Sequence, residues 1–133
     1  MRASATWKQE MIFDAVSHSG HTIVFDGDDA HAQGISPMEA VLMGLCGCTA
    51  MDVVSILKKK REPFTGLTVS AVAERDSAPP KVFTQVNLVY RVTGEVSHKA
   101  MEDAVRLSES KYCGVAAMLS KTAKIEFVIE YAA

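Results

Sequence analysis

The chain has 133 residues, of which 48% are hydrophobic and 23% are charged, and its formal net charge is −2. This balance is typical of one folded globular domain and excludes a disordered chain, so we expect residues 1–133 to form a single domain. The weak charge argues against nucleic acid as a partner. No run approaches the roughly 18 uninterrupted apolar residues of a membrane span, and the N-terminus lacks the apolar segment of a secretion signal. We therefore expect a cytoplasmic protein with no membrane association.

Short strands are predicted over the first quarter of the chain. Residues 3–7, 11–16 and 21–25 are rich in β-branched or aromatic side chains, and polar connectors of hairpin length separate them. This pattern predicts a three-stranded antiparallel meander. The polar, glycine-containing residues 26–35 that follow predict a loop.

A long helix is predicted to begin after Ser36, which suits the N-cap position. Pro37 suits the first helical position, and Glu39 can complete a capping box. The helix is expected to run to about Lys60, where basic residues complement the helix dipole. Its first half has almost no polar face, which is typical of a helix buried on all sides. We infer that a dimer partner covers its far side.

The second half of the chain alternates two hairpin strands, a helix and a last strand. Residues 66–75 and 81–92 alternate apolar and polar positions, which predicts a long hairpin with one buried face. A second helix is expected after Ser97, with an interruption at Gly114, before a strand over residues 124–131. The order βββ-α-ββ-α-β predicts an α+β fold in which an antiparallel sheet carries helices on one face.

The three cysteines are the residues whose chemistry stands out. An odd number of thiols in a chain of this size points away from structural disulfides and towards buried, metal-bound or redox-active thiols. Cys48 lies within the apolar helix, and Cys113 lies where the second helix is interrupted; each taken alone is most simply a packed core residue. Asp52 follows Cys48 by one helical turn and shares its face. Such a carboxylate would raise the pKa of the thiol, unless it pairs with a cation.

A metal site is not expected. Cys46 and Cys48 are two positions apart and point to different helix faces, so they chelate poorly, and we interpret Cys46 as a core residue. No histidine or cysteine pair has zinc-site spacing. The four histidines are interpreted as surface or hairpin residues.

The segment from Ser36-Pro37-Met38-Glu39 to Cys48, together with Lys111-Tyr112-Cys113, resembles the OsmC/Ohr family of osmotically inducible and organic-hydroperoxide-resistance proteins. In that family a cysteine follows the helix-starting proline by eleven residues and a second cysteine follows about 65 residues later, as Cys48 and Cys113 do here. The element order matches along essentially the whole chain. Within the family, the sequence looks most like the YhfA-like branch.

The resemblance implies an OsmC-like fold, an intertwined homodimer and a thiol-dependent peroxidase. Cys48 would attack an organic hydroperoxide and become a sulfenic acid, and Cys113 would condense with it to a disulfide. A dithiol reductant, in the family a lipoylated protein or a small thiol, would reopen the disulfide. No metal or organic cofactor is implied.

Three departures from the family pattern leave a second hypothesis open. Met38 occupies the position where the peroxidases usually carry a glutamate that orients a catalytic arginine, and Glu39 comes one residue later. The loop over residues 26–35 lacks that arginine, for which Arg75 or Arg91 is a candidate substitute. Gly114 follows the second cysteine where proline is common. The alternative is a non-catalytic OsmC-like protein that senses redox state or binds a small hydrophobic ligand. Purely structural thiols are a weaker third reading.

Overall fold

The N-terminal strands form a sheet of their own in the computed structural model, which describes all of residues 1–133. Strands β1 (Ala3–Gln9), β2 (Ile12–Ser17) and β3 (Thr22–Asp26) pair antiparallel in the order β1-β2-β3, which confirms the meander. They belong to the first of two compact units, Met1–Val41 and Leu42–Ala133, and each unit is described here by itself. Within its own unit this sheet has almost no buried side chains.

Helix α1 (Pro37–Lys59) begins as its sequence predicts, because Ser36 and Glu39 form the capping box. Its buried residues are Leu45, Thr49, Val53 and Leu57, which follow one another at intervals of four and form one stripe. On other faces Met43 is 60% exposed and Met51 is 74% exposed in the single chain.

By length and composition alone, α1 would be long and apolar enough to cross a membrane. The core helices of soluble proteins share that property. Thr49 lies in the buried stripe of α1, and its hydroxyl is hydrogen-bonded to that of Tyr90 in the neighbouring sheet. We therefore interpret α1 as a core helix of an α+β domain.

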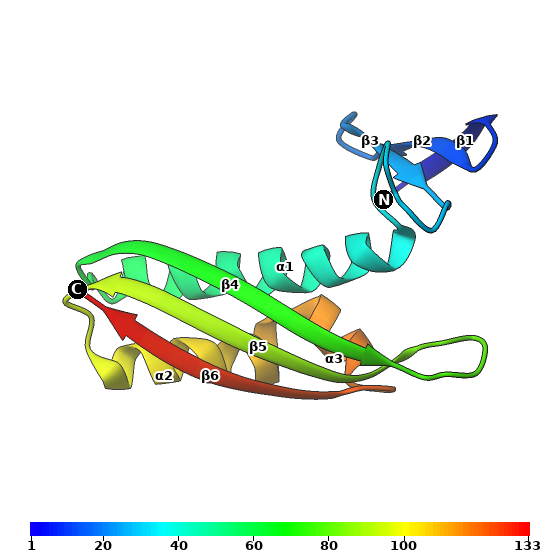
Figure 1. Cartoon of the computed structure of the whole chain (residues 1–133). Coiled ribbons are helices and arrows are strands. Elements are labelled where there is room, and N and C mark those ends of the chain that lie inside the picture. Colours follow the sequence, from blue (N-terminus) through cyan, green and yellow to red (C-terminus); the bar gives the residue numbers. More distant parts are fainter. The chain divides into compact units, whose positions relative to one another are not determined.

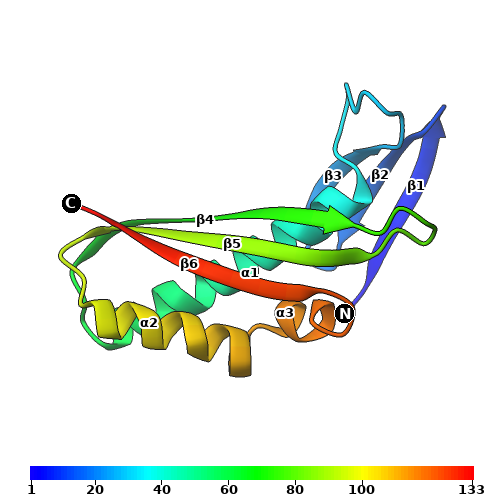
Figure 2. The ribbon, with the colours of Figure 1, turned by 60° about the horizontal axis from the view of Figure 1, so that its bottom comes forward.

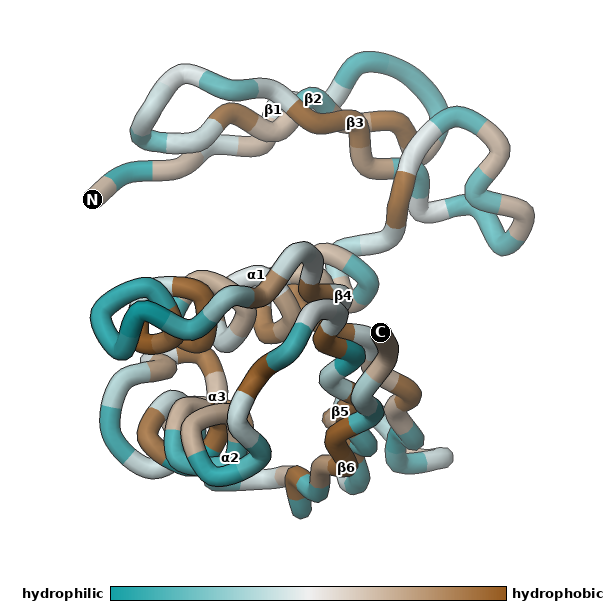
Figure 3. Tube along the Cα trace, turned by 90° about the vertical axis from the view of Figure 1, so that its left-hand side faces the viewer, coloured by the Kyte–Doolittle hydropathy of each residue, from teal (hydrophilic) through white to brown (hydrophobic).

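The second unit is a sheet with helices on one face. Strands β4 (Phe64–Arg75), β5 (Phe83–Gly94) and β6 (Lys124–Ala132) form it in that order, and α2 (His98–Leu107), η1 (Ser108–Tyr112) and α3 (Gly114–Leu119) connect β5 to β6 (Figure 1). Figures 2 and 3 show α1, α2 and α3 on the same side of this sheet. The central strand β5 buries alternate side chains, among them Val86, Leu88, Tyr90 and Val92.

The direction of β6 differs from the expected antiparallel sheet. β4 and β5 pair antiparallel, whereas β5 and β6 pair parallel, with Tyr90 opposite Ile129, so this sheet is mixed. The reason is that α2, η1 and α3 together act as a crossover connection, which returns the chain to the start of β5 before β6 begins. The α+β class and the element order are confirmed.

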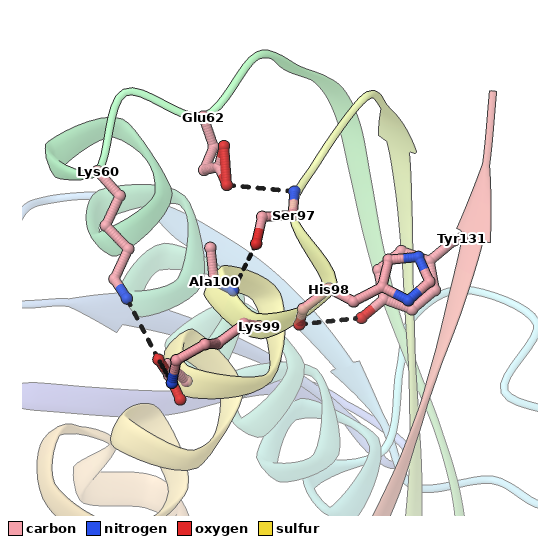
Figure 4. A network of polar contacts seen from close by, with 8 residues as sticks. Lys60, Glu62, Ser97, His98, Lys99, Ala100 and Tyr131 are labelled. Carbon is pink, nitrogen blue, oxygen red and sulfur yellow. Dashed lines mark hydrogen bonds and ion pairs between the residues drawn. The ribbon is translucent and has the colours of Figure 1, made fainter.

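A cluster of polar contacts ties the end of α1 to the start of α2. The Glu62 carboxylate accepts a hydrogen bond from the backbone N–H of Ser97 at 3.1 Å, and Lys60 pairs with Asp103 at 3.5 Å. The His98 ring stacks on Tyr131 of β6, with ring centroids 3.7 Å apart. Figure 4 shows these contacts converging where the two helices and β6 meet. They join α1, which carries Cys48, to the start of the crossover that leads to Cys113.

Replacement of Gly94 by alanine is expected to destabilise the fold. Gly94 has a φ of +101°, and a Cβ added there would lie 2.6 Å from the Pro63 carbonyl oxygen. Backbone strain of this kind costs about 1–3 kcal/mol, so the free energy of unfolding should fall by at least that amount. Urea denaturation measures it. Gly114→Ala is the matched control, because nothing lies within 4 Å of its added Cβ. Equal stability of the two variants would contradict this prediction.

Candidate functional site

The structure brings Cys48 and Cys113 together. Cys48 lies on α1 and Cys113 lies between η1 and α3, and the two sulfurs and a carboxylate oxygen of Asp52 all lie within 4.8 Å of one another. The three cysteines are free thiols. Cys113 is buried, while Cys48 and Asp52 are half-buried. The arrangement therefore places two reduced thiols and one carboxylate at a partly accessible point.

The backbone of a π-helical turn holds Cys113 in place. The N–H of Cys113 donates to the Ser108 carbonyl oxygen at 2.7 Å, which closes η1, a type of turn that is frequent at functional sites. Cys113 itself is extended, and its sulfur accepts a hydrogen bond from the Ala116 N–H at 3.3 Å. The interruption predicted at Gly114 is thus a π turn followed by one extended residue.

The Cys113 thiol is held in its protonated form. Burial, and then the hydrogen bond and charge of the neighbouring Cys48, raise the pKa of Cys113 to about 11, against the opposing effect of the Ala116 N–H. Of the two thiols Cys113 is the more buried. The more accessible Cys48 is therefore better placed to meet a solute first.

A buried chain of hydroxyl groups runs away from this cluster. Asp52 accepts a hydrogen bond from Ser108 at 2.8 Å, and the Ser108 hydroxyl lies 2.8 Å from that of Thr49. Thr49 lies 2.6 Å from the hydroxyl of Tyr90, which lies 3.2 Å from a carboxylate oxygen of Glu109. Thr49, Tyr90 and Ser108 are each 0% exposed. Five side chains from α1, β5 and η1 thus form one continuous polar chain that ends beside the thiols.

The site residues predicted from the sequence did not include Thr49, Tyr90, Ser108 or Glu109. A signal for part of the set was present. Thr49 is the one polar residue in an otherwise apolar stripe of α1, and Tyr90 places its hydroxyl on the buried face of β5. A buried hydroxyl must find a hydrogen-bond partner, so each of these positions required a polar neighbour.

Replacement of Glu109 by glutamine is expected to change how stability depends on pH. Burial raises the pKa of Glu109 above the ordinary value of 4.5, against the opposing effects of Tyr90 and Arg106. Above pH 4.5 the unfolded chain loses a proton that the folded protein keeps, so the stability contributed by this group falls as pH rises towards its folded-state pKa. Urea denaturation between about pH 4 and pH 8 should show that fall in the wild type and not in Glu109→Gln. A control, Glu102→Gln, alters an exposed carboxylate of α2 and should follow the wild type. Parallel curves for all three proteins would contradict the prediction.

The other two predicted supporting residues have local contacts elsewhere. Glu39 accepts hydrogen bonds at the start of α1, and these lower its pKa. It belongs to the Met1–Val41 unit, whose position relative to Cys48 is not described. The Arg75 Nε donates to the Lys81 carbonyl oxygen at 2.9 Å, at the exposed turn between β4 and β5. The structure therefore supports Asp52 as a neighbour of the thiols and gives Glu39 and Arg75 roles in a helix cap and a turn.

Cys46 and the histidines lie apart from the thiol cluster. Cys46 is half-buried, and burial raises the pKa of its thiol. His31 contacts the carbonyl oxygen of Asp26 at 2.7 Å within the first unit, and His98 stacks on Tyr131.

Two thiols and a carboxylate, as in the cluster of Cys48, Cys113 and Asp52, are donors that a cation such as Zn²⁺ favours. However, Cys113 is buried and its sulfur accepts from the Ala116 N–H, and Asp52 accepts from Ser108, so we assign no metal to them.

A pocket opens beside Asp52. Its volume is about 310 Å³, and its walls combine apolar side chains with two lysines. The lining residues are Asp52, Ser55, Ile56, Lys59, Lys60, Leu107 and Tyr112. Because Asp52 neighbours both thiols and Tyr112 precedes Cys113, the pocket adjoins the thiol cluster.

Comparison with known proteins identifies the family. A family model described as OsmC-like protein matches residues 27–128. The chain belongs to the OsmC-like family. Protein YhfA of Escherichia coli K12 is 42% identical over 134 residues, a match that covers 100% of this chain and 99% of YhfA.

Solved OsmC-like structures confirm the fold. A hypothetical protein from Aquifex aeolicus is 30% identical with a TM-score of 0.84, over 98% of this chain and 96% of that one. An OsmC organic hydroperoxide resistance protein from Legionella pneumophila is 12% identical with a TM-score of 0.74, over 97% and 95%. The organic hydroperoxide resistance protein OhrB of Bacillus subtilis is 12% identical with a TM-score of 0.67, over 98% of each chain. At these last two identities the likeness concerns the fold alone.

Proposed function

We propose that this OsmC-like protein is a thiol-dependent peroxidase that reduces organic hydroperoxides through Cys48 and Cys113. The observation that carries the proposal is the meeting of two free thiols, 65 residues apart in the chain, within 4.8 Å of each other and of Asp52. Fold relatives whose names record organic hydroperoxide resistance support the choice of substrate class. The adjoining pocket has apolar side chains beside its charged ones, and these suit the organic part of such a substrate.

The proposed cycle has three steps. The Cys48 thiolate attacks the distal oxygen of the hydroperoxide, the O–O bond breaks, and an alcohol leaves while Cys48 becomes a sulfenic acid. The sulfur of Cys113 then displaces the sulfenic oxygen, which leaves as water, and an S–S bond forms. A dithiol reductant, for which a lipoylated protein is our candidate, reopens that bond by exchange and restores both thiols.

The two thiols suit these different tasks. Cys48 is half-buried and able to meet the peroxide, whereas Cys113 is buried and holds its proton up to a pKa of about 11. A thiol that stays protonated reacts slowly with peroxide, because the thiolate is the nucleophile. This difference favours Cys48 as the peroxidatic thiol and Cys113 as the resolving thiol.

The experiment is a thiol count on the reduced protein before and after one equivalent of cumene hydroperoxide, with intact mass measured alongside. Three cysteines are present, so the proposed reaction should leave one titratable thiol and remove two hydrogen atoms from the mass. Peptide mapping should place the new disulfide between Cys48 and Cys113. If the three thiols are oxidised no faster than free cysteine, the peroxidase is refuted.

We also propose that the chain forms a homodimer. In the single chain α1 exposes Met43 and Met51, and the N-terminal sheet exposes Trp7. The exposed Ile23 of that sheet lines a hollow of about 520 Å³. Contiguous apolar surfaces of this kind usually mark an interface. Sedimentation equilibrium should give twice the mass of the 14.4 kDa chain, and a monomer at micromolar concentration would contradict this proposal.

The second candidate is a non-catalytic protein that senses redox state or binds a small hydrophobic ligand. It is favoured by the place of Arg75, whose Nε donates to the Lys81 carbonyl oxygen in an exposed turn and not to a thiol. In the thiol-count experiment, a reversible oxidation far slower than peroxidase turnover would select this candidate. A rise in melting temperature with a hydrophobic ligand, measured separately, would also select it.

A further inference from the structure

We propose that Glu109, Tyr90, Thr49, Ser108 and Asp52 form a proton relay, which shares one mobile proton between its two carboxylates and delivers it to the Cys48–Cys113 site. The role at the thiols rests on the proposed peroxidase function. The relay itself rests on geometry alone. Its five side chains are joined by the four contacts of 2.6–3.2 Å described above, and its three hydroxyl groups are completely buried.

The number of protons requires one of the two carboxylates to be protonated. A chain of four hydrogen bonds needs four hydrogen atoms, and the hydroxyl groups of Tyr90, Thr49 and Ser108 supply only three. If both carboxylates were ionised, two oxygens at hydrogen-bond distance would face each other with no hydrogen between them. Such a contact between two oxygens is costly here, because the hydroxyl groups are completely buried and cannot bond to solvent instead. One additional proton, on either end, satisfies every link.

The relay has two equivalent directions. With the proton on Glu109, each group donates towards Asp52, so Glu109 donates to Tyr90 and the last bond runs from Ser108 to the ionised Asp52. With the proton on Asp52, each bond reverses and the negative charge sits on Glu109. Burial raises the pKa of Glu109, against the opposing effects of Tyr90 and Arg106, so Glu109 is an end of the relay that holds the proton.

The position of the charge matters for the thiols. With Asp52 ionised, a thiolate on Cys48 would lie within 4.8 Å of a second negative charge, which disfavours it. When the proton moves to Asp52, the negative charge moves to Glu109, at the other end of the relay. Cys48 can then lose its proton to water without the negative charge of Asp52 beside it. The relay therefore makes the Cys48 thiolate easier to form, without the arginine that the family pattern supplies.

The same proton completes the reaction. The electron pair of the Cys48 thiolate forms the S–O bond and the O–O bond breaks, which leaves an alkoxide. Asp52 donates its proton to that alkoxide, which departs as the alcohol. Glu109, which is half-buried, takes up a proton from solvent and resets the relay. One proton leaves Cys48 and one enters at Glu109, so the step balances as thiol plus hydroperoxide giving sulfenic acid plus alcohol.

The first test needs no peroxide. Infrared difference spectra at neutral pH should show one carboxylic-acid carbonyl band in the reduced wild-type protein, shifted in heavy water. Glu109→Gln should lack this band, because the amide can donate to Tyr90 and leave Asp52 ionised. Glu102→Gln, an exposed change on α2, should keep it. A wild-type spectrum with no such band would overturn the relay.

The second test breaks the relay in its middle. Thr49→Val keeps the shape of the side chain and removes its hydroxyl, and Thr49→Ser restores the hydroxyl. In single-turnover oxidation by cumene hydroperoxide, Thr49→Val should be slower by about 10²-fold, a typical share for proton transfer, and Thr49→Ser should recover to within a few-fold. Circular dichroism confirms that each variant is folded.

The outcomes separate the two proposals. Oxidation of folded Thr49→Val at the wild-type rate would overturn the role of the relay at the thiols. If the wild type itself does not react with the hydroperoxide, the peroxidase fails, and the infrared band still decides whether the shared proton exists. Equal slowing of Thr49→Val and Thr49→Ser would also count against the relay, because it would indicate a packing effect.

Discussion

Cys48→Ser is expected to lower the rate of organic hydroperoxide reduction to the uncatalysed background, a loss on the order of 10³-fold or more, as removal of a reacting nucleophile usually produces. A serine hydroxyl is not ionised near neutral pH, and it cannot form the S–O bond on which the cycle depends. The effect should be large because the other thiol of the cluster cannot take over the attack. Cys113 is buried and its pKa is raised to about 11, so it cannot replace Cys48.

Two further variants sharpen that result. Without a thiol reductant, Cys113→Ser should consume one equivalent of hydroperoxide at close to the wild-type rate and then stop, with Cys48 heavier by one oxygen atom. Cys46→Ser is the matched control, since Cys46 lies on the same helix and outside the thiol cluster, and it should turn over like the wild type. Steady-state consumption of cumene hydroperoxide with a dithiol distinguishes Cys48→Ser from Cys46→Ser, and intact mass after oxidation without the dithiol identifies the oxidised Cys48 of Cys113→Ser. Turnover that survives in Cys48→Ser would contradict the proposed role of this residue.

Leu45→Ala should produce a large loss of stability. Leu45 is 0% exposed and lies in the buried stripe one turn before Thr49. Truncation of a buried leucine removes apolar contacts and leaves a cavity, which costs about 2–5 kcal/mol. Urea denaturation at fixed protein concentration should show that decrease in the free energy of unfolding.

Met43 provides the control for this measurement, since it is 60% exposed and lies only two residues away. In the isolated chain Met43→Ala should change stability by less than about 0.5 kcal/mol, as surface changes usually do. If α1 is covered by a second copy, Met43→Ala should instead weaken association, and its stability loss should grow as the protein is diluted. A Leu45→Ala loss below about 1 kcal/mol would contradict the packing described here.

Local sequence patterns predicted most of the secondary structure because each has a local cause. Ser36 and Glu39 bond to each other's backbone at the start of α1, and the Ser97 hydroxyl accepts from the Ala100 N–H at the start of α2. The alternation along β5 reports its one buried face. Such signals depend on residues within a few positions of each other, which a sequence displays directly.

The candidate site was only partly predictable. Cys48, Cys113 and Asp52 were identified, the first two through their spacing and the third through its helical turn. The hydroxyl chain was missed because Thr49 contacts Tyr90 across 41 residues and Ser108 across 59. No periodicity relates such positions. The parallel direction of β6 was missed for a similar reason, since alternation shows that a strand has two faces but does not show which way it runs.

The parallel pairing of β5 with β6 has a consequence for the order in which the protein matures. Cys113 lies in the crossover between these strands, and no residue of β6 belongs to the thiol cluster. During synthesis Cys48 emerges 65 residues before Cys113, and no second strand closes the crossover until β6 has also emerged. Non-local strand pairing of this kind forms late. The reactive thiols should therefore meet only at the end of folding, so a nascent or truncated chain that lacks the last nine-residue strand carries both cysteines yet has no redox pair to be oxidised.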